Sequence, residues 1–189
     1  MPDSRDGIQV LVDDHREVEN LFQQYEKSDD TGEQTRIVHQ VIHELAVHGE
    51  IEELLFYPRL RAALPDGNSL ADEAVHEHLE IKQTLNKLDK MTAEDDGFAT
   101  LMQSLMAEVR HHVEEEENDI FPKIREAVAA DQLDKLGTSL QGAKAIVPTR
   151  PHPSAPTGPV GKLATSPPVA LIDRVRDQVR KWRDEAAEG

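Results

Sequence analysis

The chain contains 189 residues, of which 38% are hydrophobic and only 4% aromatic, a composition that fits one helical domain with an aliphatic core. Its net charge of −16 argues against nucleic acid and against an anionic membrane surface as partners of the main body. The absence of cysteine excludes disulfides, haem–thiolate and iron–sulfur chemistry, so any metal must be held by His and carboxylate side chains.

No segment predicts membrane insertion or export. No apolar run approaches the roughly 18 residues of a membrane-spanning helix. The first residues, Met-Pro-Asp-Ser-Arg-Asp, lack the apolar core of a signal peptide. We therefore expect no membrane span and a cytoplasmic location.

The first predicted helix extends from about Ile8 to Tyr25. Its apolar residues recur at intervals of three and four, which is the spacing of one buried helix face. His15 occupies one position of this stripe in place of an aliphatic residue. We therefore expect the His15 side chain to point into the core.

The second predicted helix follows a polar turn and runs to about Arg61. Thr31 and Gln34 have the spacing of a capping box at its start. Pro58 lies inside the helical pattern and should kink the helix or break its hydrogen-bond ladder. The core stripe of this helix contains Val41, Leu45, His48, Glu52 and Leu55.

The third predicted helix begins near Ser69 and Asp72, after a Pro-Asp-Gly turn. At roughly 100° per residue, His76 is rotated by about 160° from His78 and should be solvated. The core stripe contains Ala71, Ala74, His78, Ile81, Leu85 and Leu88.

The fourth predicted helix begins between Thr92 and Phe98. His111 lies about 100° away from its core stripe. That stripe contains Phe98, Leu101, Leu105, Val109, His112 and Glu116. The other members of the acidic run 114–117 are expected to be solvated, and these are Glu114, Glu115 and Glu117.

The remainder of the chain predicts three further segments. Asp131 to Val147 has the pattern of a short closing helix. Residues 148–168 contain seven of the eleven prolines, which indicates an extended or disordered linker. Residues 169–189 predict one amphipathic, modestly basic helix that would dock on the bundle, on a second copy or on a partner protein. We therefore expect a four-helix bundle over residues 1–147, followed by the linker and the terminal helix.

The chain contains an internal repeat. The segment His48–Pro58 recurs as His112–Pro122 at an offset of 64, with a Glu four residues and a Pro ten residues after the His in each copy. A further His precedes each copy, His15 by 33 residues and His78 by 34. Two copies imply a pseudo-two-fold arrangement of four helices.

The repeated residues have the chemistry of a metal site. Helical side chains four apart share a face, so each His-x-x-x-Glu presents an imidazole beside a carboxylate, a donor set that suits iron, manganese or zinc. A single core histidine is more often structural than a ligand, but here the four histidines on core stripes are the four that the repeat relates. The predicted ligands are His15, His48, Glu52, His78, His112 and Glu116.

Two alternatives compete with this assignment. Glu73-x-x-His76 and Glu108-x-x-His111 match the Glu-x-x-His spacing of ferritin-like di-iron proteins, but helical phase disfavours them because both histidines face away from the aliphatic stripe. A metal-free structural bundle is the other alternative. It would leave four imidazoles and two carboxylates in the core at about 1–3 kcal/mol each, unless they paired with one another.

Two shorter segments accompany the repeated segments His48–Pro58 and His112–Pro122, namely Asp14-His15-Arg16-Glu17 and Glu77-His78. In these four segments the chain resembles hemerythrin-like proteins of the HHE cation-binding family, and the resemblance covers about residues 7–130. The resemblance implies an all-α, up-down four-helix bundle with a non-haem centre of two iron ions, bridged by the two glutamates and capped by the histidines. Other divalent metals are possible. It also implies dioxygen or small oxidants as partners, because the family includes oxygen carriers, oxygen and iron sensors, and members that consume peroxide or nitric oxide.

The chain departs from the oxygen-carrier pattern. Oxygen carriers have a second His four residues from the first on the third helix, where this chain has Ala74 and Lys82. One iron would then keep an open position, or recruit Tyr57 if the kink at Pro58 turns that side chain inward. Two functions stay open: a protein that binds oxygen or senses and handles iron and redox state, and an enzyme that decomposes peroxide or reacts with nitric oxide at the open position.

Overall fold

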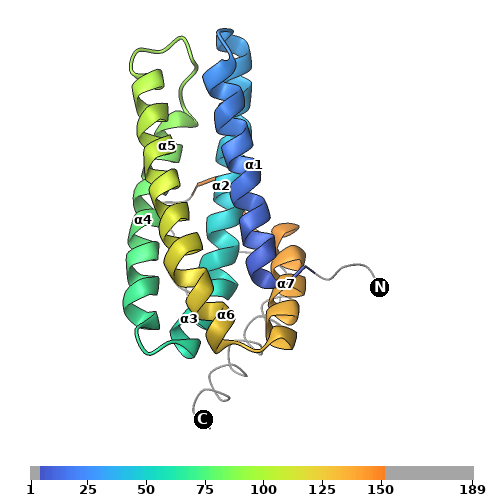
Figure 1. Ribbon diagram of the computed structural model, residues 1–189. Coiled ribbons are helices and arrows are strands. Elements are labelled where there is room, and N and C mark those ends of the chain that lie inside the picture. Colours follow the sequence, from blue (N-terminus) through green and yellow to red (C-terminus); the bar gives the residue numbers. More distant parts are fainter. Residues whose placement is uncertain (1–4, 152–189) are drawn as a thin grey trace.

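The computed structural model describes residues 5–151 and shows long helical rods that run up and down beside one another (Figure 1). The helices are α1 (Gly7–Lys27), α2 (Thr31–Ile51), η1 (Glu52–Phe56), α3 (Tyr57–Ala63), α4 (Gly67–Leu88), α5 (Phe98–Glu115), η2 (Glu116–Ile120), α6 (Phe121–Ala127) and α7 (Ala130–Lys144). The predicted all-α four-helix bundle is confirmed. No helix in the described range is long and apolar enough to cross a membrane. The predicted helix 169–189 and the linker beyond residue 151 lie outside the described residues.

The helix starts differ in detail from the sequence prediction. Asp30, not Thr31, caps α2, because its side chain accepts a hydrogen bond from the Glu33 backbone N–H at 2.7 Å and Thr31 is already helical. Helix α4 begins two residues before Ser69, at Gly67. A Cβ at position 67 would overlap the carbonyl oxygen of Leu60, so only glycine permits this close turn.

Both motif-bearing helices contain a π-helical turn immediately before a proline. The backbone N–H of Tyr57 bonds to the carbonyl of Glu52, and that of Phe121 to the carbonyl of Glu116, so each bond spans five residues. Pro58 has no N–H to continue the α-helical ladder, which explains the predicted break. The wide turn stacks each residue over the one five positions before it, and π-turns of this kind are frequent at functional sites. Tyr57 is thereby brought over Glu52.

A polar layer separates two apolar clusters inside the bundle. One cluster combines the ends of the rods near α3 and α6 with α7, and contains Leu11, Ile51 and Ile124. The other fills the opposite end and contains Val18, Leu45 and Leu105. Between them the repeated His and Glu side chains are buried. Ionisable groups in such a layer need partners, because their transfer from water is otherwise costly.

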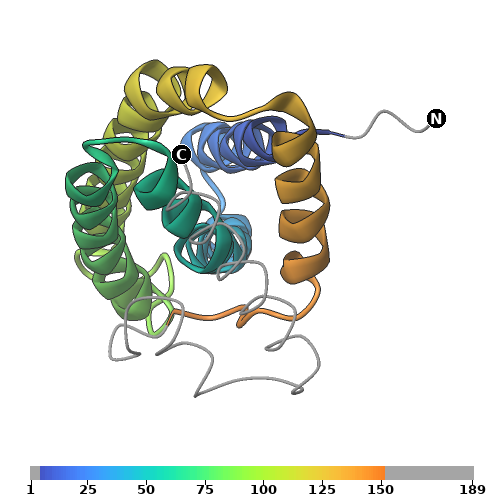
Figure 2. The ribbon, with the colours of Figure 1, turned by 90° about the horizontal axis from the view of Figure 1, so that it is seen from below.

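Helix α7 covers only one side of the bundle. It packs along α1 and α2, away from α4 and α5 (Figure 2). Leu133, Leu136 and Leu140 join the apolar cluster at this end of the molecule. The rods of the second half therefore lack an equivalent cover within the described residues.

Candidate metal centre

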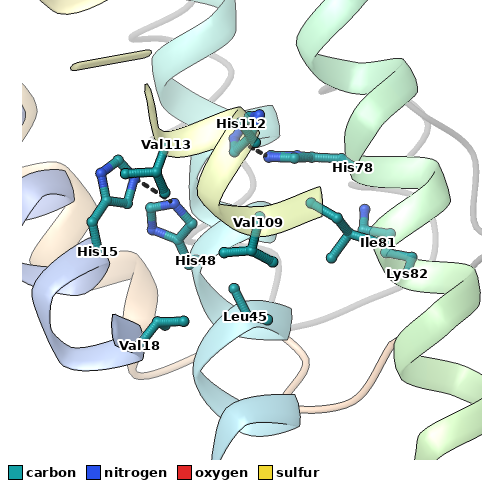
Figure 3. A pocket seen from close by; sticks show the side chains of 11 residues that line it. His15, Val18, Leu45, His48, His78, Ile81, Lys82, Val109, His112 and Val113 are labelled. Carbon is teal, nitrogen blue, oxygen red and sulfur yellow. Dashed lines mark hydrogen bonds between the residues drawn. The ribbon is translucent and has the colours of Figure 1, made fainter. Parts of the chain in front are cut away.

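The six residues predicted as ligands meet at one point in the polar layer. The structure groups His15, His48, Glu52 and Glu116 on one side, and His78 and His112 with Glu52 on the other; within each group the potential donor atoms lie within 4.8 Å of one another. Figure 3 shows the histidines as two facing pairs. The Nε2 atoms are 3.2 Å apart in the pair from α1 and α2, and 3.1 Å apart in the pair from α4 and α5.

Each of the two glutamates lies between the pairs. Glu52 Oε2 is 3.0 Å from His48 Nε2 and 3.3 Å from His78 Nε2. A carboxylate in this position contacts one histidine from each half of the repeat. Glu52 therefore has the placement of a bridging group.

Glu116 occupies the same position on the opposite side. Its Oε2 is 3.4 Å from His15 Nε2 and 3.7 Å from His112 Nε2. Both glutamates are fully buried. The two carboxylates therefore complete a symmetric set of four imidazoles and two shared acids.

These carboxylates lack the hydrogen bonds that burial demands. Within the described residues, neither oxygen of Glu52 nor Oε2 of Glu116 accepts a hydrogen bond of acceptable geometry. Most buried polar atoms in proteins have such a partner, and a missing one costs about 1–3 kcal/mol, more for a charged group. Cations placed between the imidazole nitrogens and these oxygens would satisfy both. The donor set thus fits a metal centre.

Each histidine is held from behind by a carboxylate that the sequence analysis did not assign. The four bonds, from Nδ1 to oxygen, are His15–Glu117 (2.8 Å), His48–Asp14 (3.4 Å), His78–Glu53 (3.2 Å) and His112–Glu77 (2.7 Å). A carboxylate accepts, so Nδ1–H donates, and Nε2 is the nitrogen that faces the centre and can bind a metal once it is unprotonated. Metal-binding histidines usually have this arrangement.

The placement of Glu117 corrects one prediction. It was expected to be solvated, but its side chain is only 20% exposed and binds both His15 and Arg16. The hydrogen bond from His15, opposed by partial burial and reinforced by Arg16, lowers the pKa of Glu117 to about 2. Glu117 therefore carries its charge at neutral pH.

The charges of the centre are strongly coupled in the metal-free protein. Burial disfavours the His48 imidazolium, but the Glu52 and Asp14 carboxylates outweigh this and raise the pKa of His48 to about 10. Burial likewise opposes the charge of Glu52, yet His48 and His78 hold the pKa of its carboxyl well below the usual range. In the metal-free protein, a proton on His48 thus takes the place that a cation would fill.

Tyr57 enters the centre from the π-turn of the first half. Its hydroxyl donates to Glu116 Oε1 at 3.2 Å and lies 3.1 Å from His78 Nε2. Burial, together with the neighbouring Glu116 carboxylate, raises the pKa of Tyr57 well above its ordinary value. The repeat-related residue is Phe121, whose ring stacks on His15 at a centroid distance of 5.8 Å. At this position the two halves therefore differ by one hydroxyl group.

The competing histidines lie outside the centre. The side chains of His76 and His111 are 73% and 65% exposed. Helical phase had predicted this placement. Neither Glu-x-x-His pair takes part in the buried cluster.

An apolar cavity adjoins the four imidazoles (Figure 3). Its volume is about 20 Å³, which is enough for one water-sized molecule. The side chains that line it, besides the histidines, are Val18, Leu45, Ile81, Lys82, Val109 and Val113. Lys82 donates to Glu53 at 2.6 Å and so supports the carboxylate behind His78.

Comparisons with known proteins find relatives with the same kind of domain. The chain is 31% identical over 174 residues to an uncharacterized hemerythrin-like protein of Schizosaccharomyces pombe, covering 92% of this chain and 86% of that protein. It is 28% identical over 141 residues to a protein named DNA nickase from Nostoc, covering 75% of this chain but only 40% of that protein.

A solved structure shares the fold. A hemerythrin HHE cation-binding-domain protein from Mycobacterium kansasii matches with a TM-score of 0.64 at 23% identity, covering 89% of this chain and 98% of that chain. The family model of the Hemerythrin HHE cation binding domain matches residues 6–124, a range that contains all six predicted ligands. The chain therefore belongs to the hemerythrin HHE cation-binding family.

Proposed function

We propose that the protein holds two iron ions in the polar layer, one at each histidine pair, with Glu52 and Glu116 shared between them. The observation that supports this is the set of buried carboxylate oxygens that accept no hydrogen bond while imidazole nitrogens face them. Manganese or zinc would suit the same donors. One ion would be held by His15 and His48 and the other by His78 and His112.

We propose further that the centre binds dioxygen or senses and handles iron and redox state. Bound iron supplies the redox chemistry. The chain contributes an apolar cavity of about 20 Å³ beside the histidines, which admits a small oxidant and excludes larger molecules. The carboxylates behind the histidines orient the imidazole rings so that Nε2 faces the centre.

A second candidate is an enzyme that decomposes peroxide or reacts with nitric oxide. The Tyr57 hydroxyl favours it, because it donates to Glu116 in one half while the other half has Phe121. Because its pKa is raised, Tyr57 remains protonated at neutral pH and would pass its proton only to an oxygen atom more basic than its own phenolate. Reversible oxygen binding needs no such net proton delivery.

The test begins with anaerobic loading of the purified protein with Fe²⁺ and metal analysis. We expect two iron atoms per chain and an absorption change on exposure to air. Release of oxygen under vacuum would support the binding function, and catalytic loss of added peroxide or nitric oxide would support the enzyme. A protein that takes up no metal would contradict both and leave a structural bundle.

We propose no nucleic-acid partner. The name DNA nickase belongs to a relative, and the region of that protein that aligns with this chain is only 40% of its length. A net charge of −16 opposes binding to a phosphate backbone.

Replacing Glu117 by alanine is expected to weaken metal binding by about 10- to 100-fold, because His15 loses the carboxylate that orients it. A metal-competition titration with a chelator measures this. Glu114→Ala is the matched control, since Glu114 lies one turn earlier on the same rod and is exposed. Equal affinities for the two variants would show that the Glu117 contact does not support the centre.

We also propose that residues 1–147 form the metal-binding unit, with the terminal helix as a docking or output element. A chain that ends at Val147 should retain two metals and nearly all its thermal stability. It loses the exposed pair between Arg150 and Asp89, and such pairs contribute about 0–1 kcal/mol. A shortened chain that loses metal, measured by elemental analysis, would place part of the centre downstream.

A further inference from the structure

A second hollow lies on the side of the bundle that α7 leaves uncovered. It is a groove of about 270 Å³ between α4 and the rod formed by α5 and η2. Its ionisable lining residues are Glu73, Glu77, Glu115, Asp119, His112 and Glu116. The last two are buried members of the metal centre, so the groove connects the protein surface with the centre.

The charge of this groove is one-sided. Among the residues that line it there is no Lys or Arg, although Lys123 pairs with Asp119 from the next turn at 2.8 Å. A different groove of about 210 Å³ reaches His15, and its lining mixes Arg16 and Arg110 with Glu19, Glu114 and Glu117. Fixed positive charges repel cations and fixed negative charges attract them. Of these two hollows, the α4–α5 groove suits the passage of a cation better, because no Lys or Arg lines it.

Comparison of the two halves of the repeat shows that the acidic groove is specific to the second half and is not required by the fold. In the first half, the positions equivalent to Glu73, His111, Glu115 and Asp119 are Val10, Val47, Ile51 and Leu55. All four of these residues are buried. Three of them belong to the apolar cluster that includes α7.

The carboxylates that orient the histidines also differ between the two halves of the repeat. Asp14, behind His48, is paired with Lys144 of α7. Its counterpart Glu77, behind His112, has no lysine partner of this kind among residues 5–151 and lines the open groove. Within the described residues, the first half is thus covered by α7 and its Lys144, whereas the second half has acidic side chains along an open groove.

A cluster of possible donors lies beside this groove. His111 Nε2 is 3.4 Å from Glu115 Oε1 and 3.8 Å from Glu77 Oε1. The donor atoms of the three residues lie within 4.8 Å of one another. The side chains of His111 and Glu115 are 65% and 42% exposed, so a hydrated ion can reach them.

Glu77 connects this outer cluster with the buried centre. Its Oε1 faces His111, while its Oε2 accepts from His112 Nδ1 at 2.7 Å. Farther in, the groove meets Glu116, which is fully buried and whose Oε2 accepts no hydrogen bond. From the outer cluster, the carboxylates of the groove therefore lead to Glu116, whose Oε2 lacks a hydrogen-bond donor.

We propose that Glu77, His111 and Glu115 form an outer binding site for a divalent metal ion, and that the acidic groove is the route by which this ion reaches the buried centre. The proposal rests on the proposed metal-binding function. It assigns His111 a part in loading, not in the finished centre.

The first test looks for the outer site directly. Full-length protein whose centre has been loaded with iron is titrated with Mn²⁺, and free Mn²⁺ is followed by electron paramagnetic resonance. We expect one additional, weaker Mn²⁺ site, which His111→Ala and Glu115→Gln remove and Glu114→Gln retains. Absence of this site in the unaltered protein, or its persistence in both variants, would overturn the proposal.

The second test measures loading. Metal-free protein is mixed anaerobically with Fe²⁺, and bound iron is followed over time. Glu115→Gln and His111→Ala should slow uptake by about tenfold, and uptake by the unaltered protein should slow as salt is added, because electrostatic guidance is screened. The final iron content should equal that of the unaltered protein.

The outcomes separate this proposal from the function on which it rests. Two irons bound at an unchanged rate in both variants would refute the route and leave the metal centre intact. No iron bound by the unaltered protein would instead refute the proposed function. Both substitutions are at partly exposed positions, where changes usually alter stability by less than about 0.5 kcal/mol, and a melting curve for each variant verifies that it folds.

Discussion

Replacing Glu116 by alanine is expected to reduce the iron content from two atoms per chain to fewer than about one. Glu116 Oε2 faces His15 and His112, one from each pair, so its loss removes a donor from both metal positions at once. His48→Ala should also lower the content sharply, because one position then keeps only His15 of its pair. Elemental analysis of anaerobically loaded protein measures both effects.

Two exposed histidines, one on α4 and one on α5, provide the controls for this experiment. His76→Ala and His111→Ala remove exposed imidazoles and should leave the equilibrium iron content unchanged. Glu116→Gln preserves the side-chain volume while removing its charge, which separates loss of a donor from loss of packing. If His76→Ala and His111→Ala abolish iron binding while His78→Ala and His112→Ala do not, the centre has been assigned to the wrong face.

The helices and their inward faces could be predicted because each depends on the pattern within one segment. A 3/4 spacing identifies which side of a helix is buried. It placed His15 and His78 correctly and left His76 outside. The repeat then related the inward-facing positions of the two halves, so the gathering of these side chains in the core could be expected before the structure.

The carboxylates behind the histidines could not be found in this way. Glu117 directly follows Glu116 and lies off the core stripe of its own helix, so periodicity assigns it to solvent. Its partner His15 comes from α1, and no pattern within one helix reports what a neighbouring helix presents. A signal did exist, because Glu53 and Glu117 occupy the same position in the two copies.

Two further features are the inward position of Tyr57, which depends on local backbone geometry, and the open groove, which depends on the helices against which α7 packs. The inward position of Tyr57 follows from the π-turn that Pro58 favours, which changes the helical phase for the residues after Glu52. The open groove follows from the docking of α7 on the first half alone. Comparing the copies would have indicated it, since Val47 and Ile51 correspond to His111 and Glu115.

Removing the metal is expected to lower the melting temperature by about 10 °C. Ions that bind only the folded state stabilise it by about 4 kcal/mol at a thousand times their dissociation constant, and about 1 kcal/mol shifts the melting temperature of a domain this size by about 2–4 °C. Without metal, the buried oxygens of Glu52 and Glu116 depend on protonated histidines for compensation. Circular dichroism melts of chelated and reloaded protein measure the difference.

This difference should widen as pH rises. The folded-state pKa of His48 is about 10, above its ordinary value of 6.5, so in the metal-free protein its stabilisation is complete below about pH 6.5 and is lost progressively as pH rises toward 10. The metal-bound protein gains over the same range, because the ions need unprotonated imidazoles. In Glu52→Gln the carboxylate that raises the His48 pKa most is absent, so the metal-free variant should lose less stability between about pH 7 and pH 9. Equal melting temperatures with and without metal across this range would show that the ions contribute nothing to the fold.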